Sequence, residues 1–504
     1  MNIFPINNRV LIHKLSFIVF LILYSTFQIN AQSYSIEVKI KGLKDTSIFL
    51  GHHFEDKKYV ADTTYVDNNG KGIFTGDEKL DKGIYLIIMP NRTYFEIIMG
   101  EEQDFYIETD TINYIKNMKI KGSDENILFH DYQIFASEKG LKLKQLSDRK
   151  KVNKGNKDSV DIINLEMTEI NKELKEYKLN ISIEHPDYTL GKILKATVEV
   201  DIPDPPKDEN GVILDSSFQY RYYKDNYFSN FDLSDESILR TPIYYGRINQ
   251  FLKRMVYPHP DSLIVAADKL INKTRENEKV FRYTVQYIFN YYNTTKIMGL
   301  DEVFVHMAEN YYLTGEATWA DSSLLKKIEE KVIKLKPNLI GNKAPNLKLI
   351  THDNKWVTLH DIEAKFIILY FWDPDCGHCK KITPKIRDLQ KELKNHDVKV
   401  LGVYTQVEQE KWLKYIKEND LNDFINAWDP YNSTKFRTLY DIYSTPVPFI
   451  LNENKEIIAK RIDPETIKEI LYKELGLELP KTENDEEGEK KKDTANEKKN
   501  DTVN

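Results

Sequence analysis

Two cysteines, three positions apart, constrain this chain more than any other feature, because its 504 residues include no others. Cys376 and Cys379 follow an unbroken apolar run at residues 366–371, which is typical of a strand buried on both faces of a sheet. From Cys376 to about Leu393 the side chains follow a helical pattern. The sequence therefore predicts a pair of thiols where a buried strand passes into a helix.

Strands and helices alternate after this junction. Further strands are expected at residues 398–404, 449–451 and 456–461. Helices are expected at residues 408–419 and 464–475. Alternation of this kind predicts an α/β layer with parallel strands.

The two cysteines differ in their expected chemistry. A thiolate at a helix N-terminus is stabilised by unpaired backbone N–H groups and by the positive end of the helix dipole. This lowers the pKa of Cys376, which we expect to be the nucleophile. Cys379 lies almost one turn later, more buried, and is the expected resolving residue. Gly377 and His378 separate the pair, and a protonated His378 adds positive charge beside the Cys376 thiolate.

Other uses of the pair are less favoured by the sequence. A disulfide across three residues closes almost no loop and stabilises the fold very little. A structural zinc ion needs four ligands, and His352, His360 and His396 show no ligand spacing. Covalent haem attachment needs a histidine where Lys380 stands. A copper carrier that uses both cysteines and a distant histidine stays open, but we expect neither a metal ion nor another cofactor.

The rest of the chain divides by periodicity, which predicts a multidomain α+β protein. Residues 32–122 alternate polar and apolar side chains between turn signals, as in a small antiparallel β-sandwich or barrel. Residues 123–337 carry helical patterns up to a linker-like Pro337–Asn338 pair. Residues 338–479 hold the α/β pattern. Residues 480–504 have almost no apolar side chains, so a disordered charged tail is expected.

Residues 1–31 have the features of a secretory signal peptide. Arg9 and Lys14 precede an apolar run at residues 15–29, and Ala31 is a small residue suited to cleavage. An uncleaved anchor helix is the alternative, but the run is shorter than the ~20 apolar residues that a span needs. We expect a protein exported to the periplasm or cell envelope, with no stable membrane insertion after cleavage.

The charge of the chain argues against nucleic acid as a partner. The net charge is −7, from 72 basic and 79 acidic residues. A nucleic-acid-binding protein needs a concentrated basic face, and no basic stripe interleaved with aromatic residues is found.

Residues 341–478 resemble the secreted TlpA/ResA-like redoxins, which have the thioredoxin fold. The resemblance rests on residues 341–362, on residues 371–384 with Trp372 beside the dithiol, and on residues 444–451. It implies thiol–disulfide exchange with protein disulfide substrates, and we expect a membrane thiol donor to reduce the enzyme. The preceding β and helical regions resemble the accessory domains of multidomain bacterial redoxins, whose function the resemblance does not imply.

The resemblance also assigns a second segment of the site. It implies a cis peptide bond between Thr445 and Pro446, facing the dithiol. X–Pro is the bond type that adopts cis at low cost, although a trans proline in a turn is the alternative from pattern alone. In the family, the residue at the position of Thr445 presents its backbone to the substrate chain.

Two positions depart from the family pattern. Thioredoxins carry a buried acid where Tyr370 stands, and many ResA-like proteins carry a glutamate where Ile382 stands. Asp373 and Asp375 are close in sequence, but we expect them to be exposed. The proton acceptor for Cys379 is therefore not evident, and water is one alternative.

Two competing functions remain. Peroxiredoxins share the fold, but their PxxxTxxC site needs threonine and proline where Asp373 and Leu369 stand. The second competing function is that of a binding protein, in which the β and helical regions bind a partner or a glycan and the redox domain is secondary. The sequence leaves open the substrates, the direction of electron flow and the oligomeric state.

Overall fold

The computed structural model describes residues 34–54 and 56–480. The described residues up to Val256, with Leu270–Phe281, form one compact unit, and Tyr257–Lys269 with the described residues from Arg282 form another. The predicted signal peptide and nearly all of the predicted charged tail lie outside the described residues. The domain boundaries expected from the sequence stay a prediction.

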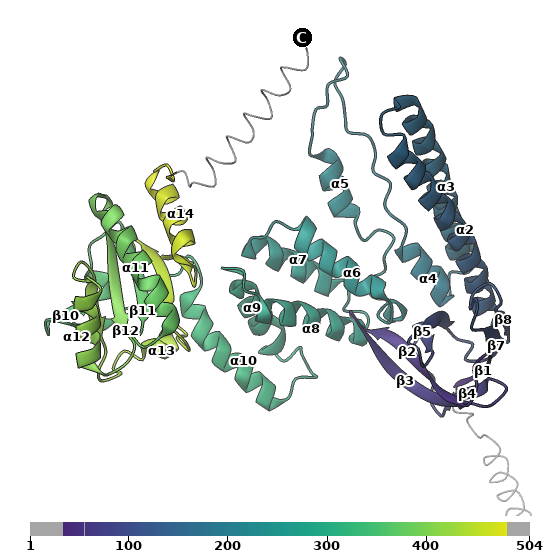
Figure 1. The fold of residues 1–504 in the computed structure, drawn as a ribbon, viewed down its shortest axis with the longest axis horizontal. Helices are drawn as coiled ribbons and strands as arrows, with labels where there is room; N and C mark the ends of the chain where they lie inside the picture. The colour runs from purple at the N-terminus through teal and green to yellow at the C-terminus, as the bar shows by residue number, and fades with distance from the viewer. Residues whose placement is uncertain (1–33, 55, 481–504) are drawn as a thin grey trace, which may run out of the picture. The chain divides into compact units, whose positions relative to one another are not determined.

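The N-terminal β region of the first unit consists of two four-stranded sheets that share one core (Figure 1). One sheet has the order β4 (Lys71–Gly76), β1 (Tyr34–Lys41), β7 (Asp104–Asp110), β8 (Lys119–Lys121). The other has the order β3 (Lys57–Val66), β2 (Thr46–Phe54), β5 (Gly83–Ile88), β6 (Tyr94–Met99). The strands pair antiparallel, as expected, except that β1 and β7 are parallel. Parallel pairing is possible there because a long connection, β2 to β6, separates the two strands.

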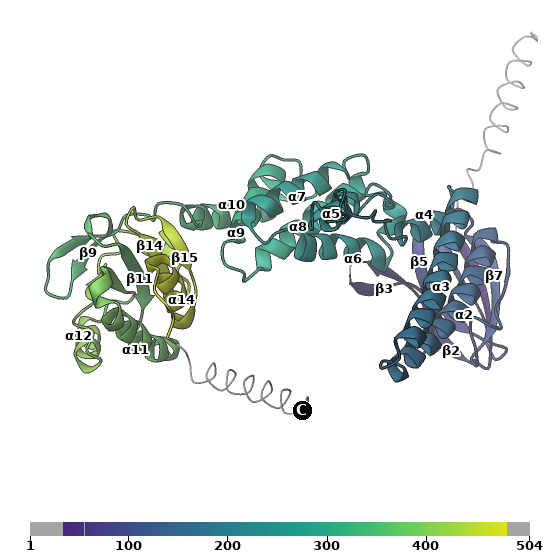
Figure 2. The ribbon, with the colours of Figure 1, turned by 90° about the horizontal axis from the view of Figure 1, so that it is seen from above.

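The helical part of this unit begins with a long hairpin of α2 (Asp124–Val152) and α3 (Lys157–Glu184), side by side in Figures 1 and 2. Ser123 caps α2, and Leu146, Ile163 and Ile170 pack between the two helices. The later elements are α4 (Thr189–Ala196), α5 (Phe218–Asn226), the 3₁₀ turn η1 (Glu236–Ile238), α6 (Pro242–Gln250) and the π turn η2 (Phe251–Met255).

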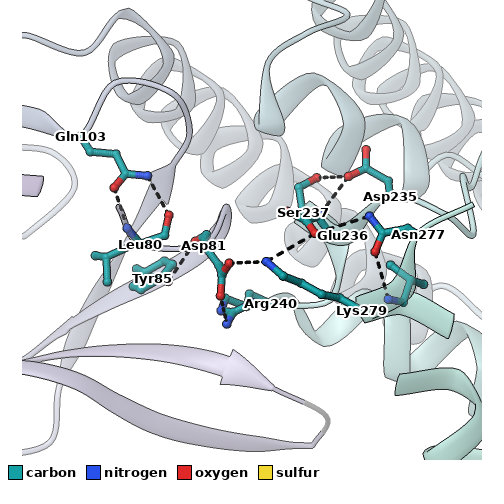
Figure 3. A network of polar contacts seen from close by, with 11 residues as sticks. Leu80, Asp81, Tyr85, Gln103, Asp235, Glu236, Ser237, Arg240, Asn277 and Lys279 are labelled. Carbon is teal, nitrogen blue, oxygen red and sulfur yellow. Dashed lines mark hydrogen bonds and ion pairs between the residues drawn. The ribbon is translucent and has the colours of Figure 1, made fainter. Parts of the chain in front are cut away.

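A polar network joins the β region to these helices within the first unit (Figure 3). Asp81, just before β5, pairs with Arg240 and with Lys279, whose Nζ lies 2.8 Å from the carboxylate. The Arg240 carbonyl also accepts a hydrogen bond from Ile84 N at 3.1 Å. Gly83 permits this approach, because a Cβ there would lie 2.5 Å from the Arg240 Cβ.

We expect Asp81→Asn to lower the free energy of unfolding of the first unit by about 1–2 kcal/mol, because it leaves Arg240 without its anion and Lys279 with Glu236 alone. Burial would raise the pKa of Asp81, but Lys279 and Arg240 outweigh it and hold the pKa below its usual value. The wild type should therefore lose this stabilisation as pH falls through the lowered pKa, and the variant should not. Urea unfolding at several pH values measures both effects.

Glu101→Gln is the matched control, because Glu101 also pairs with two lysines but its side chain is 68% exposed. Exposed pairs contribute roughly 0–1 kcal/mol. Equal effects of the two substitutions would contradict a structural role for the Asp81 network.

Two helices, α7 (Pro260–Asn272) and α8 (Glu278–Thr294), contribute residues to both units. The second unit continues with α9 (Asp301–Met307), the π turn η3 (Ala308–Tyr312), α10 (Ser322–Leu335) and the 3₁₀ turn η4 (Lys336–Asn338). The linker-like interpretation of Pro337–Asn338 is wrong. Asn338 is buried, its side chain donates to the carbonyls of Lys334 and Leu439, and its own carbonyl accepts from the buried Lys460.

The C-terminal part of the second unit is built on a seven-stranded mixed sheet. Its order is β10 (Trp356–Thr358), β9 (Lys348–Thr351), β13 (Ile425–Trp428), β12 (Val398–Tyr404), β11 (Phe366–Trp372), β14 (Val447–Asn452), β15 (Ile457–Lys460). The strands β11 and β12 are parallel, as predicted, and β13, a strand that the sequence analysis did not predict, is parallel to β12. The prediction of a parallel layer is wrong for the outer strands, which pair antiparallel. Hairpin connections, such as the short turn between β14 and β15, require antiparallel neighbours.

Helices and turns cover both faces of this sheet. They are η5 (Leu359–Asp361), α11 (Gly377–Glu392), η6 (Lys394–His396), α12 (Gln409–Glu418), α13 (Phe436–Leu439) and α14 (Pro464–Leu475). Alternate residues of β11 point to opposite cores: Ile368 and Tyr370 face α11, α12 and α14, whereas Ile367 and Leu369 face α13. Every residue of β11 is buried, so the predicted two-faced strand is confirmed.

Among the helices of residues 34–54 and 56–480, none combines the length and the apolar character needed to cross a bilayer.

Candidate active site

The two cysteines lie where β11 passes into α11. Cys376 is the N-cap residue of α11, and its N–H donates to the Asp373 carbonyl at 3.1 Å. Cys376 is half-buried, whereas Cys379 has no exposed surface. Both thiols are free, so the described state is the reduced one.

The environment of Cys376 favours its thiolate. Burial alone would raise the pKa of this thiol, but interactions of the sulfur with the backbone N–H groups of Cys379 and His378 and with the side-chain hydroxyl of Thr445 outweigh burial and lower the pKa. These N–H groups belong to the first turn of α11, which has no internal partners for them. The helix terminus therefore supplies the stabilisation that the sequence predicted for this position.

The environment of Cys379 has the opposite effect. Its side chain points into the core between the sheet and α11. Burial raises the pKa of Cys379 to about 12, and the neighbouring Cys376 adds to the rise. One turn of helix therefore holds a thiol that ionises readily next to a thiol that stays protonated.

The segment before β14 meets the dithiol. The Thr445–Pro446 peptide bond is cis, and the Thr445 carbonyl lies 3.1 Å from the Cys376 sulfur. Antiparallel pairing of β11 with β14 sets Phe371 opposite Val447, which directs both segments to the same edge of the sheet. Cys376, Thr445 and Pro446 are thus brought together.

The other predicted site residues take different positions. Gly377 and His378 are exposed on the first turn of α11, and a Cβ at Gly377 would meet no atom within 4 Å. Trp372 is fully buried beneath the site, where its ring lies 6.5 Å from that of Tyr370 and 5.2 Å from that of Tyr415. His378 is therefore open to a partner, whereas Trp372 supports the site from within the core.

The nearby carboxylates are engaged away from Cys379. The Asp373 carboxylate accepts hydrogen bonds from Asp375 N and from Gln406 Nε2, both at 2.9 Å. The exposed Asp375 pairs with Lys411 at 3.2 Å. Within the described ranges, no cluster of three or more histidine, cysteine or acidic side chains is arranged to hold a metal ion.

Sequence reasoning missed a group of hydroxyls beneath the dithiol. The Tyr370 hydroxyl lies 2.9 Å from Thr383 Oγ1, and both residues are fully buried. Tyr370 also interacts with the Cys379 thiol, and Tyr415 interacts with Thr383. The sequence marked Tyr370 only as the position of a missing acid.

Family comparison matches two parts of the chain. Residues 34–129 match a domain of unknown function, DUF4369, and residues 340–460 match the AhpC/TSA family. Residues 340–460 form a thioredoxin-fold domain. Both cysteines, Thr445 and Pro446 lie within this AhpC/TSA match.

Curated relatives agree with this assignment. A thiol-disulfide oxidoreductase ResA of Bacillus cereus is 25% identical over 131 residues, which are 26% of this chain and 74% of that protein. ResA of Oceanobacillus iheyensis is 32% identical over 122 residues, which are 23% of this chain and 62% of that protein. The predicted resemblance is confirmed, and the likeness supports a thiol–disulfide oxidoreductase.

Solved structures also resemble parts of the chain. A domain of a possible thiol-disulfide isomerase from Cytophaga hutchinsonii is 39% identical and covers 27% of this chain and 92% of its own, with a TM-score of 0.26. A thioredoxin-like protein from Bacteroides caccae is 20% identical and covers 54% of this chain and 97% of its own, with a TM-score of 0.42.

We expect iodoacetamide to alkylate Cys376 of the reduced protein at neutral pH and to leave Cys379 unmodified. The thiolate is the form that reacts with iodoacetamide. A lowered pKa therefore lets Cys376 react at pH values below the ordinary thiol pKa of 9.0. Peptide mass spectrometry across a pH series measures both sites.

The single-cysteine variants serve as controls. Cys379→Ser should keep the fast reaction, and Cys376→Ser should leave a thiol that resists alkylation at neutral pH. Equal labelling of the two sites would contradict the opposite pKa shifts.

Proposed function

We propose that this protein is an exported thiol–disulfide oxidoreductase that exchanges disulfides with protein substrates through Cys376 and Cys379. The observation that carries the proposal is the pair of opposite environments within one helical turn. The half-buried Cys376 has a lowered pKa, and the fully buried Cys379 has a pKa raised to about 12. Such a pair can attack a substrate disulfide with the Cys376 sulfur while the Cys379 thiol stays protonated until the second step.

In the first step, the Cys376 thiolate attacks one sulfur of a substrate disulfide. The substrate S–S bond breaks, one substrate sulfur leaves as a thiolate, and a mixed disulfide with Cys376 forms. The Thr445 carbonyl, 3.1 Å from the attacking sulfur, offers a backbone acceptor to the incoming substrate chain.

In the second step, Cys379 loses its proton and attacks the Cys376 sulfur. A Cys376–Cys379 disulfide forms, the mixed disulfide breaks, and the second substrate sulfur leaves. The substrate gains two electrons and the enzyme is oxidised. We assign the re-reduction of the enzyme to a membrane thiol donor. This assignment and the proposed export both rest on the signal-peptide features of residues 1–31.

Peroxidase activity is the competing chemistry within this fold. Asp373 occupies the position where the peroxidatic motif needs a threonine hydroxyl, and its carboxylate is bound by Gln406. A negative charge there is unsuited to binding a peroxide beside a thiolate. Consumption of hydrogen peroxide at a rate equal to disulfide exchange would favour the peroxidase.

We expect Cys379→Ser to accumulate covalent complexes with disulfide-containing proteins through Cys376, because the resolving sulfur is gone. Non-reducing electrophoresis with insulin as the substrate detects the complex, and reductant should release it. Cys376→Ser is the matched control and should form none. If Cys379→Ser forms no adduct while the wild type reduces insulin, the two-step mechanism is wrong.

If the full chain is instead a binding protein, loss of the two cysteines should have a different effect. If the β and helical regions carry the function, replacement of both cysteines by serine should leave it unchanged. Loss of insulin reduction together with loss of function in cells would support the oxidoreductase.

We expect the reduction potential of the pair to lie above the value of about −270 mV for thioredoxin, because stabilising the Cys376 thiolate stabilises the reduced form. Equilibration with glutathione buffers measures it. A value near that of protein disulfide isomerase, about −180 mV, favours isomerase action. A value at or below that of thioredoxin would contradict the expectation and favour a reductase.

A further inference from the structure

We propose that Tyr370, Thr383 and Tyr415 form a hydroxyl relay that carries the proton of Cys379 from the core to solvent while the mixed disulfide is resolved. The proposal rests on the thiol–disulfide exchange proposed above.

The second step of the proposed exchange, in which Cys379 attacks the mixed disulfide, requires a path for the proton of Cys379. Cys379 must become a thiolate, yet it has no exposed surface and its pKa is raised to about 12. The carboxylates of Asp373 and Asp375 are bound to other groups. Asp373 contributes a backbone hydrogen bond, not its carboxylate, to the environment of Cys379.

The inner part of the relay lies between β11 and α11. Tyr370 points from β11 into the core that contains Cys379, and its hydroxyl interacts with that thiol. Thr383 follows Cys379 by four positions in α11, so the two side chains lie on the same face of the helix. The 2.9 Å contact between Tyr370 and Thr383 joins these fully buried groups.

The outer part of the relay is on α12. The Tyr415 side chain interacts with Thr383, and Tyr415 is only half-buried. Its ring packs against Trp372 at 5.2 Å, which fixes the orientation of the phenol. Tyr415 thus links a fully buried hydroxyl to the surface of the domain.

Hydroxyl groups suit this task because each one donates and accepts a hydrogen bond at the same time. The Cys379 thiol gives its proton to the Tyr370 oxygen as the Tyr370 hydroxyl gives its own to Thr383. Thr383 passes a proton to Tyr415, which releases one to water. One proton leaves, all three hydroxyls end neutral, and the new Cys379 thiolate attacks the Cys376 sulfur. The departing substrate thiolate takes up a proton from water.

The charged and titratable groups around the relay come from three elements. Arg387 lies in α11, and Cys376 is the N-cap residue of that helix. Tyr415 lies in α12 and Tyr370 in β11. Arg387 lowers the pKa of Tyr415 in part, although burial has the larger, opposite effect.

Release of thionitrobenzoate from 5,5′-dithiobis(2-nitrobenzoate) separates the two steps in the reduced full-length protein. The first equivalent reports the attack by Cys376, and the second reports resolution by Cys379. We expect Tyr370→Phe to slow the second phase at neutral pH by about a hundredfold, the lower end of the range for general acid–base catalysis, with the first phase unchanged. The second phase should also become more steeply dependent on pH, because hydroxide must then remove the proton.

Tyr415→Phe tests the relay at a half-buried position and should slow the same phase. Tyr404→Phe is the matched control: its ring lies 6.3 Å from that of Trp372, but its hydroxyl donates to the Glu408 carbonyl outside the relay. It should leave both phases unchanged.

The outcomes separate the relay from the proposed function. If the wild type releases both equivalents, and Tyr370→Phe and Tyr415→Phe keep its second-phase rate from pH 6 to 9, the relay is wrong and exchange stands. If the wild type releases no first equivalent, the proposed function fails and the relay with it. Equal slowing in Tyr404→Phe would show a packing effect and would also overturn the relay.

Discussion

The antiparallel pairing of β11 with β14 is the constraint on which the site depends. It brings the chain that leaves β11 toward Cys376 to the same edge of the sheet as the chain that enters β14 from Thr445. The contact between the Cys376 sulfur and the Thr445 carbonyl therefore joins residues 69 positions apart. Because β11 is buried on both faces and pairs with β12 on its other side, the nucleophile has a fixed place.

The chemistry of the dithiol follows from one turn of helix placed at that edge. The cap position sets Cys376 among unpaired N–H groups, whereas three residues later the helix turns Cys379 into the core. The same turn thus lowers one pKa and raises the other. A protein that separates its two thiols in this way needs a route for the proton of the buried one, and the neighbours of Tyr370 offer it.

Much of the C-terminal fold could be predicted because its signals are local. The strand at 398–404 and the helix at 464–475 have the bounds that the pattern indicated. The directions of the outer strands and the burial of Asn338 could not be predicted in this way. Both depend on which distant segments pair, and a run of apolar residues has the same pattern in either direction.

The sequence by itself determined the dithiol, its place between a buried strand and a helix, and the absence of an acid at the position of Tyr370. These properties belong to neighbouring residues and to the periodicity of the backbone. Only the tertiary structure decided that Thr445 meets Cys376 and that the hydroxyls of Tyr370, Thr383 and Tyr415 gather beneath Cys379. Those contacts join different elements, and burial, which sets the pKa of Cys379, exists only when the elements pack.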